Sequence, residues 1–352
     1  MDKKELTLLN IGDDLDTLMN LDPRGYGVCR ILYDGSRKYA GEPLSVHCAK
    51  ALVENVKAGE RVFILTGFVL PPWNEAETDG IISSTVFASF IIKAFSAKPV
   101  MIVPDQCVKA IEKMCPELGV SISYDPANIG ENTVCVIPFT KDDSKAAAQA
   151  EEILSYGKPC LVFSNEAPGR NKNGYYHNAT GINTSDLEPK YDVLYVKCQE
   201  LGICTVSIGD LGNEIGCGAI EDHIRKYIPY AELGGCKAGT GYGILVDTKA
   251  DYLLTATVSD WGCNAIMAAT AFILGNTELF HTPDVQSRVM DAAASAGMLD
   301  MYGEARPYID GIGKNIVLPM VSLMKALIEY PPTVEDKTAT WFDKTISKGF
   351  YQ

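Results

Sequence analysis

The stretch TVSIGDLGNEIGCGAIEDHIRKY, residues 205–227, joins a predicted strand to a predicted helix through a glycine-rich loop. The apolar run over 203–210 is typical of a buried strand, and the apolar spacing over 218–228 is typical of a helix. The loop between them combines four glycines with three polar residues: Gly209, Gly212, Gly216, Gly218, Asp210, Asn213 and Glu214. Glycine-rich turns between a strand and a helix usually hold phosphate groups, so the two carboxylates raise the question of what this loop binds.

The same alternation of strand and helix extends over the rest of the chain. Residues up to about 58 are predicted to be helical. Beyond them, apolar runs predict strands at 61–68, 98–105, 120–125, 132–139, 158–167, 203–210, 242–247 and 251–259. Helical spacing predicts helices at 80–97, 107–118, 144–157, 192–202, 218–228, 262–275, 282–297 and 316–330. This order predicts an α/β fold with a three-layer, mostly parallel Rossmann-like sheet and helices on both faces. We expect residues 1–352 to form a single α/β domain.

The composition is that of a globular protein and argues against several classes of partner. Of the 352 residues, 47% are hydrophobic and 22% are charged, and the formal net charge is −14. Such a charge repels nucleic-acid backbones, and no run of Lys and Arg is present to recruit an anionic membrane. We therefore predict a small-molecule partner, no nucleic acid and no membrane. A homo-oligomer stays open.

The eleven cysteines indicate a reducing compartment. They are scattered without a CxxC pair, which argues against a zinc or iron–sulfur site. Their odd number and apolar surroundings are typical of buried free thiols. The N-terminus lacks the apolar core of a signal peptide, and no stretch approaches the roughly 20 apolar residues of a membrane helix. These features predict a cytoplasmic protein.

Carboxylates follow four of the predicted strands. In a parallel sheet, ligands bind beyond the carboxyl ends of the strands, so these loops form the candidate site. The carboxylates in the four loops include Glu77, Asp79, Glu166, Asp210, Glu214 and Asp260. Loops are commonly rich in such residues, and Asp often caps a helix. Four acidic strand ends nevertheless predict one cleft lined by carboxylates, a few amides and Arg170.

Converging carboxylates have two main uses. They bind a hard cation such as Mn²⁺ or Mg²⁺, or they raise one another's pKa and serve as acid and base. Both alternatives stay open at this point. The predicted metal ligands are Asp210, Glu214 and Asp260, and a helical spacing of four would put the first two on one face. No GxGxxG, GxxxxGK[ST] or GxSxG motif is present, so no nucleotide cofactor is predicted.

Four motifs, taken in order, resemble the D-glutamate cyclase-like C-terminal domain family. They are LTGF with ETDG at 65–68 and 77–80, NEAPGRNKNGYYHN at 165–178, SIGDLGNEIGCG at 207–218 and TVSDWGCNAI at 257–266. The resemblance covers about residues 20–320 and leaves a C-terminal helical tail at 321–352. The glycine-rich loop is its most specific block. Well-known members carry another domain in front, whereas this chain is expected to be a stand-alone form.

The resemblance implies a lyase that closes D-glutamate to 5-oxo-D-proline with loss of water. A carboxylate or His177 would take the amine proton, and a carboxyl with a raised pKa would protonate the leaving oxygen. Arg170 would clamp the α-carboxylate, and N–H groups of the glycine loop would hold the oxyanion. The catalytic candidates are Glu77, Asp79, Glu166, Glu214 and His177. The substrate-binding candidates are Thr66, Gly67, Arg170, Gly209, Gly212, Asn213, Gly216, Ser259 and Trp261.

Two positions depart from the family pattern. Leu211 stands where the family usually has glycine, and a side chain there would crowd a ligand or oppose a positive φ. Cys217 stands where methionine is usual. Two alternatives to the cyclase therefore stay open: a metal-dependent enzyme acting on a phosphorylated small molecule, and a non-catalytic ligand-binding protein.

Overall fold

The computed structural model describes residues 3–332 and 343–349. The central sheet contains the strands β1 (Arg61–Thr66), β4 (Lys98–Val103), β5 (Ser121–Ser123), β6 (Thr133–Pro138), β7 (Pro159–Asn165), β8 (Cys204–Gly209) and β9 (Tyr252–Thr255). Two short hairpins are formed by β2 (Val69–Leu70) with β3 (Glu75–Ala76), and by β10 (Tyr308–Ile309) with β11 (Ile312–Gly313). The α-helices are α1 (Lys3–Met19), α2 (Val28–Ala40), α3 (Leu44–Asn55), α4 (Ile81–Phe95), α5 (Asp105–Glu117), α6 (Asp143–Ser155), α7 (Tyr191–Glu200), α8 (Glu221–Tyr227), α9 (Ser259–Ile273), α10 (Pro283–Ala296) and α11 (Lys314–Glu329). Short 3-10 helices lie at Gly218–Ile220 and Thr277–Leu279.

The seven strands of the central sheet are all parallel, in the order β5-β6-β4-β1-β7-β8-β9. This confirms the predicted α/β fold. From β1 the chain first builds the sheet outward through β4, and it later returns to the other side of β1 to add β7, β8 and β9. The direction of winding therefore reverses between β1 and β7, and ligands of open α/β sheets bind at such a switch point.

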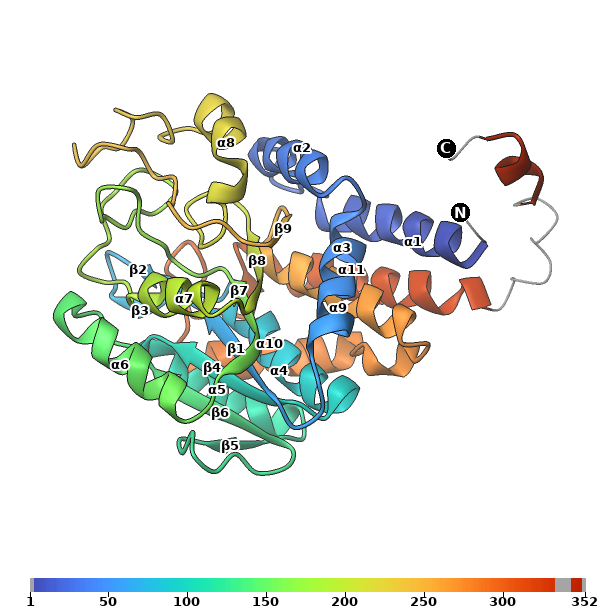
Figure 1. The fold of residues 1–352 in the computed structure, drawn as a ribbon, viewed down its shortest axis with the longest axis horizontal. Helices are drawn as coiled ribbons and strands as arrows, with labels where there is room; N and C mark the ends of the chain where they lie inside the picture. Colours follow the sequence, from blue (N-terminus) through green and yellow to red (C-terminus); the bar gives the residue numbers. More distant parts are fainter. Residues whose placement is uncertain (1–2, 333–342, 350–352) are drawn as a thin grey trace.

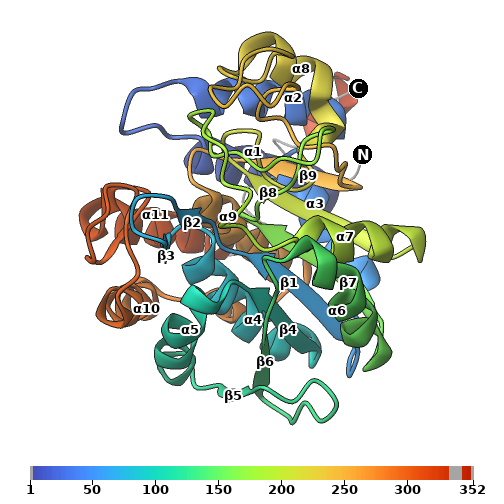
Figure 2. The same ribbon diagram turned by 90° about the vertical axis from the view of Figure 1, so that its left-hand side faces the viewer.

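Helices cover both faces of the sheet, because alternate strand residues are buried on opposite sides. On one face, Val62 and Ile64 of β1 join the largest apolar core, which is closed by α3, α4, α5 and α9. On the other face, Phe63 and Leu65 pack under α6 and α7. Figure 2 shows α6 and α7 on the side of the sheet opposite α4, α5 and α10. This is the three-layer arrangement that the sequence predicts.

Helices α1 and α11, far apart in the sequence, are brought together beside the sheet. Helix α1 packs against α9 and α11, and Figure 1 shows these three helices in one layer. A third, smaller apolar core lies between α2, α8 and the β9 edge. The backbone N–H of Thr257 donates to the carbonyl of Met19 at 3.0 Å, so the segment after α1 meets the segment after β9.

One predicted strand is wrong. Residues 242–247 form a loop, because the backbone takes positive φ angles at Tyr242 (60°) and Gly243 (63°). Strand β9 is instead the edge of the sheet. Of the predicted tail at 321–352, the first part belongs to α11, and residues 333–342 and 350–352 lie outside the described residues. None of the described helices has the length and apolar character needed to cross a lipid bilayer.

Candidate active site

The four acidic strand ends meet at one edge of the sheet. Strands β1, β7, β8 and β9, whose loops carry the predicted carboxylates, are consecutive neighbours. At their carboxyl ends Thr66 lies beside Asn165, and Asn165 lies beside Ile208. Because the strands are parallel, the loops that follow them emerge on the same side, at the switch point between β1 and β7.

The glycine-rich loop after β8 wraps around its own carboxylate. Glu214 accepts backbone N–H bonds from Leu211 at 2.9 Å, Gly212 at 2.7 Å and Asp210 at 3.2 Å. Gly209 leaves room for this arrangement, since a Cβ there would lie 2.5 Å from Glu214 Oε2. The N–H groups that would cradle a phosphate in a related loop are therefore turned toward Glu214, a side chain of the same loop.

The structure corrects two predictions about this loop. Asp210 and Glu214 are not on one face of a helix, because residues 210–217 form turns and α8 begins only at Glu221. The positive φ angles are at Gly212 (93°) and Gly216 (96°). Leu211 does not have a positive φ, so its side chain does not strain the backbone.

Asp210 projects into the site and is shared by two groups of acids. One group is Asp79, Asp210 and Asp310, and the other is Glu166, Asp210 and Glu214; within each group, three carboxylate oxygens lie within 4.8 Å of one another. Asp210 is 4% exposed, and within the described part of the chain its carboxylate receives no hydrogen bond. Burial and the neighbouring acids raise its pKa well above the ordinary value.

Glu166 lies directly after β7 with a backbone φ of 49°, a conformation that is costly for a residue other than glycine. Its Oε2 accepts a hydrogen bond from the Ser259 hydroxyl at 2.5 Å. Its backbone carbonyl accepts the N–H of Gly67 at 2.9 Å. Burial, followed by the charges of Asp210 and Glu214, raises the pKa of Glu166 well above its ordinary range.

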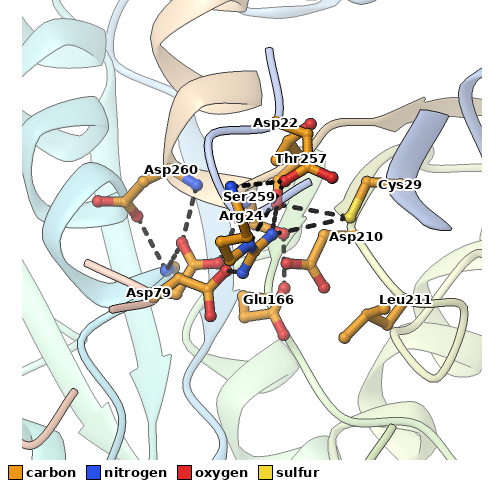
Figure 3. Close-up of polar contacts among 12 residues, drawn as sticks. Asp22, Arg24, Cys29, Asp79, Glu166, Asp210, Leu211, Thr257, Ser259 and Asp260 are labelled. Atoms are coloured by element: carbon orange, nitrogen blue, oxygen red, sulfur yellow. Dashed lines mark hydrogen bonds and ion pairs between the residues drawn. The ribbon is translucent and has the colours of Figure 1, made fainter. Parts of the chain in front are cut away.

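Asp260, a predicted metal ligand, is used by the start of α4. Its Oδ1 accepts the N–H of Gly80 at 2.8 Å and the Ser83 hydroxyl at 2.6 Å, and Asp260 belongs to neither acid group. Asp79 faces the start of α9 in a similar way (Figure 3). Two of the predicted site residues therefore hold the helices that frame the site.

A basic residue that the sequence did not reveal completes the cluster. Arg24, in the segment between α1 and α2, pairs through Nη1 with Asp310 and donates through Nη2 to the carbonyl of Thr257 at 2.7 Å. Figure 3 shows its guanidinium among the carboxylates of Asp79, Glu166 and Asp210. The only cue in the sequence is the turn-forming LDPRGYG stretch at 21–27, which has no periodic pattern.

Asp310 begins the DGIGK stretch at 310–314, a sequence typical of a loop. In the structure Asp310 (φ 48°) and Gly311 (φ 75°) form the two-residue turn between β10 and β11. Burial and the charge of Asp79 raise the pKa of Asp310 to about 7. The last hairpin of the chain thus delivers a carboxylate to a site built mainly by the central strands.

Glu77 and Glu188 extend the acidic region toward the β2–β3 hairpin. Burial, followed by the charges of Asp310 and Asp79, raises the pKa of the Glu77 carboxyl well above its ordinary value. Glu188 is fully buried and accepts the N–H of Val69 at 3.3 Å. Sequence reasoning missed Glu188, because LEPK at 187–190 looks like an ordinary solvated loop.

Arg170 and His177 are engaged by partners outside the acid groups. The Arg170 guanidinium pairs with Asp192 and donates to Tyr176 Oη at 3.3 Å. His177 is buried rather than surface-exposed, and its Nε2 lies 2.8 Å from the Thr240 hydroxyl. Burial lowers the pKa of His177. No hydrogen bond joins either side chain to the carboxylates of the acid groups.

The remaining predicted substrate-binding residues surround the site to different degrees. Thr66 ends β1 with a buried hydroxyl that lacks a partner. The side-chain amide of Asn213 donates to the carbonyl of His177 at 3.1 Å, and the N–H of Gly216 donates to Thr248 at 3.0 Å. Trp261 is fully buried in the main apolar core.

The donor set fits a divalent cation. Carboxylate oxygens are the preferred ligands of Mn²⁺ and Mg²⁺, and Asp210 presents a buried carboxylate without a protein donor. The triad of Asp79, Asp210 and Asp310 already contains a cation, the guanidinium of Arg24. Glu166, Asp210 and Glu214 are therefore the better-placed ligands.

A family profile described as D-glutamate cyclase-like, C-terminal, matches residues 15–324. The chain belongs to this family. It is 26% identical over 267 residues to the human protein named mitochondrial D-glutamate cyclase. That alignment covers 73% of this chain and 38% of the human protein, so the chain spans well under half of its relative's length. The D-glutamate cyclase-like family thus accounts for the four motifs that surround the acidic site.

Proposed function

We propose that this protein cyclises D-glutamate to 5-oxo-D-proline with release of water. The observation that carries the proposal is Asp210, a buried carboxylate that receives no hydrogen bond from residues 3–332 and 343–349 and is shared by two acid triads at the switch point of the sheet. Membership of the D-glutamate cyclase-like family supports the same reaction. In that reaction the α-amine bonds to the carbonyl carbon of the γ-carboxyl group (Cδ), the ammonium group gives up two protons, and one oxygen of that carboxyl group leaves as water.

A divalent cation held by Glu166, Asp210 and Glu214 is part of the proposal. A bound Mn²⁺ or Mg²⁺ would polarise the γ-carboxyl group and offset the repulsion between the acidic site and an acidic substrate. Glu214 accepts three loop N–H groups, and its Oε2 also accepts the Cys217 thiol at 3.3 Å. Because a thiol is a weak donor, a cation would take the place of that fourth contact. The structured loop therefore positions one ligand before any cation arrives.

Two further carboxyl groups provide acid and base. Glu77, whose pKa burial and neighbouring acids raise well above its ordinary value, gives a proton to the leaving oxygen. Asp310, with a pKa of about 7, accepts a proton from the substrate ammonium.

The alternative of a phosphorylated substrate receives less support. The glycine-rich loop is the feature that indicated a phosphate, but the N–H groups of Asp210, Leu211 and Gly212 donate to Glu214 instead. We also propose that the protein acts in the cytoplasm; all eleven cysteines are free, which suits a reducing compartment. The name of the human relative instead places that protein in mitochondria.

The test is direct. Purified, metal-stripped protein is incubated with D-glutamate or L-glutamate, with and without Mn²⁺, and 5-oxoproline is quantified by chiral chromatography with mass spectrometry. We expect lactam from D-glutamate with Mn²⁺, and loss of at least about 100-fold in rate for Asp210→Asn. Glu151→Gln, a surface acid paired with Lys197, is the matched control and keeps full rate. No lactam under any condition rejects the cyclase; D-glutamate binding without lactam would favour a ligand-binding protein.

A further inference from the structure

We infer that Arg24 is the receptor for the substrate α-carboxylate, and that the substrate takes this guanidinium over from Asp310. The inference rests on the proposed function and assigns a binding role that none of the glycine-rich motifs carries. A substrate with two carboxylates needs two cationic partners in so acidic a site. If a divalent cation serves the reacting γ-carboxyl, the α-carboxylate needs another.

Arg24 is the basic side chain that the structure places among the acids. Its Nη1 pairs with Asp310, and the negative charge of Asp210 also favours the charged form of the guanidinium. Arg170, predicted for this role from the sequence, has its guanidinium engaged by Asp192 and Tyr176. Of these two arginines, only Arg24 contacts a member of the acid groups.

The segment that carries Arg24 is built to hold it at the rim of the site. The Asp22 carboxylate accepts the backbone N–H groups of Arg24, Gly25 and Gly27 at 3.1, 3.1 and 2.7 Å. The Arg24 side chain is 13% exposed, and the guanidinium lies over the ring of Tyr26, which is 61% exposed. The turn around Asp22 thus fixes the backbone of this segment, and the guanidinium lies between solvent and the buried acids.

Asp310 occupies the place that a substrate carboxylate would take. It is a carboxylate paired with the guanidinium, and it is held on a two-residue turn rather than on a helix or a long strand. An incoming α-carboxylate offers the same charge and the same acceptor geometry. Exchange of one carboxylate for the other leaves the Arg24 guanidinium paired throughout, so this positive charge is never buried without a partner.

The exchange predicts opposite effects for the two partners. Removing the Arg24 charge must weaken D-glutamate binding, whereas removing the Asp310 charge must strengthen it, because a competitor is lost. Asn is compatible with the positive φ at position 310 and favours the same turn before Gly311. Asp310→Asn therefore removes the charge and keeps the fold of the hairpin.

The experiment measures binding of two probes by calorimetry with Mn²⁺ present: D-glutamate, and its α-amide D-isoglutamine, which lacks the α-carboxylate. We expect the wild type to bind D-glutamate roughly 30- to 100-fold more tightly than the α-amide, the range of a lost charge-assisted bond. Arg24→Gln should bind both probes alike, and Arg24→Lys should show intermediate discrimination. Asp310→Asn should bind D-glutamate roughly 3- to 10-fold more tightly than the wild type. Arg37→Gln, which breaks a surface pair with Asp13, is the matched control and keeps wild-type discrimination.

The outcomes separate this inference from the proposed reaction. Equal discrimination by the wild type and Arg24→Gln overturns the receptor role, even if lactam forms. Wild-type discrimination that Arg24→Gln abolishes supports the role, even if no lactam forms and the cyclase is rejected. No D-glutamate binding by the wild type overturns it as well. If Arg24→Gln does not fold, the double variant Arg24→Gln/Asp310→Asn removes both members of the ion pair. The single variants Arg24→Lys and Asp310→Asn then decide the question, because they should change the affinity for D-glutamate in opposite directions.

Discussion

Asp79 and Asp260 cap each other's helices. The Asp79 carboxylate, which precedes α4, accepts the N–H groups of Ser259 and Asp260 at the start of α9, at 3.1 and 2.9 Å. The Asp260 carboxylate, in the first turn of α9, accepts the N–H groups of Gly80 and Ser83 at the start of α4. Each anion also lies at the positive end of the other helix dipole. This reciprocal pair fixes the two helices that frame the acidic site.

Loss of the reciprocal cap should lower the stability of the fold and leave metal binding unchanged. Asp260→Ala leaves the Ser83 N–H without its side-chain acceptor. It also removes the shorter of the two bonds made by the Gly80 N–H and by the Ser83 hydroxyl. We therefore expect a loss of about 2–4 kcal/mol in the free energy of unfolding. Urea unfolding measures it. Asp284→Ala removes an exposed acid from the first turn of α10 and should cost less than about 1 kcal/mol. The folded Asp260→Ala variant should keep wild-type Mn²⁺ stoichiometry; loss of the ion without loss of stability would show that Asp260 is a ligand instead.

Removal of the Asp210 charge should stabilise the metal-free protein. Its carboxylate is buried beside other acids and lacks a donor, so Asp210→Asn should raise the free energy of unfolding by about 1–2 kcal/mol at pH 8. The same variant should lose the stabilisation that Mn²⁺ gives the wild type. Thermal unfolding with and without Mn²⁺ tests both effects. Asp247→Asn, an exposed isosteric change, serves as control. A destabilised Asp210→Asn protein would mean that Asp210 supports the fold.

Position 211 should tolerate the residue usual in the family, whereas position 212 should not tolerate a side chain. Leu211→Gly removes a side chain where no positive φ is needed, so we expect a change below about 1 kcal/mol and unchanged cyclase activity. Gly212→Ala places a Cβ at a φ of 93° and 3.2 Å from Ile224, which should cost about 1–3 kcal/mol and loosen the loop around Glu214. Urea unfolding and Mn²⁺ titration compare the two. A larger effect at 211 than at 212 would contradict this account.

Glu188 should make stability decrease as pH rises. Burial raises its pKa in the folded protein to about 8, from an ordinary value of 4.5. The folded state therefore binds this proton more tightly than the unfolded state, and its contribution is lost as the pH rises through the folded pKa. Relative to Glu188→Gln, the wild type should lose up to about 1.4 kcal/mol per pH unit between pH 5 and 8. Urea unfolding of both proteins across this range measures the difference, and a constant difference would contradict the raised pKa.

The fold was predictable because its strands are short apolar runs bounded by turns. Val62 to Leu65 in β1 and Leu161 to Phe163 in β7 are buried on both faces, and such runs are visible in a sequence. The run at 242–247 also contains three consecutive apolar residues, at 244–246, yet it lies in a loop. The positive φ angles at Tyr242 and Gly243 are those of a loop, and the apolar content of a segment does not predict such angles.

Of the candidate site, only the acidic residues could be predicted from the sequence. Glu166 and Asp210 directly follow β7 and β8, Asp79 lies in the segment between β1 and α4, and the parallel sheet brings the three together. The order of the strands depends on long-range packing that local patterns do not carry. Arg170 was predicted as the clamp because it follows a strand end, but Asp192, in the next helix, binds its guanidinium. Side-chain pairing between distant segments determined which arginine reaches the site.

The pair between Arg24 and Asp310 joins residues that are 286 positions apart in the chain. A ribosome adds residues in order, so the acids of the central strands are made long before the last hairpin. Until Asp310 has left the ribosome, the nascent chain holds a guanidinium without its partner and an acidic pocket without its closing turn. The ability to bind a ligand is therefore gained late in synthesis, after most of the sheet can already have formed.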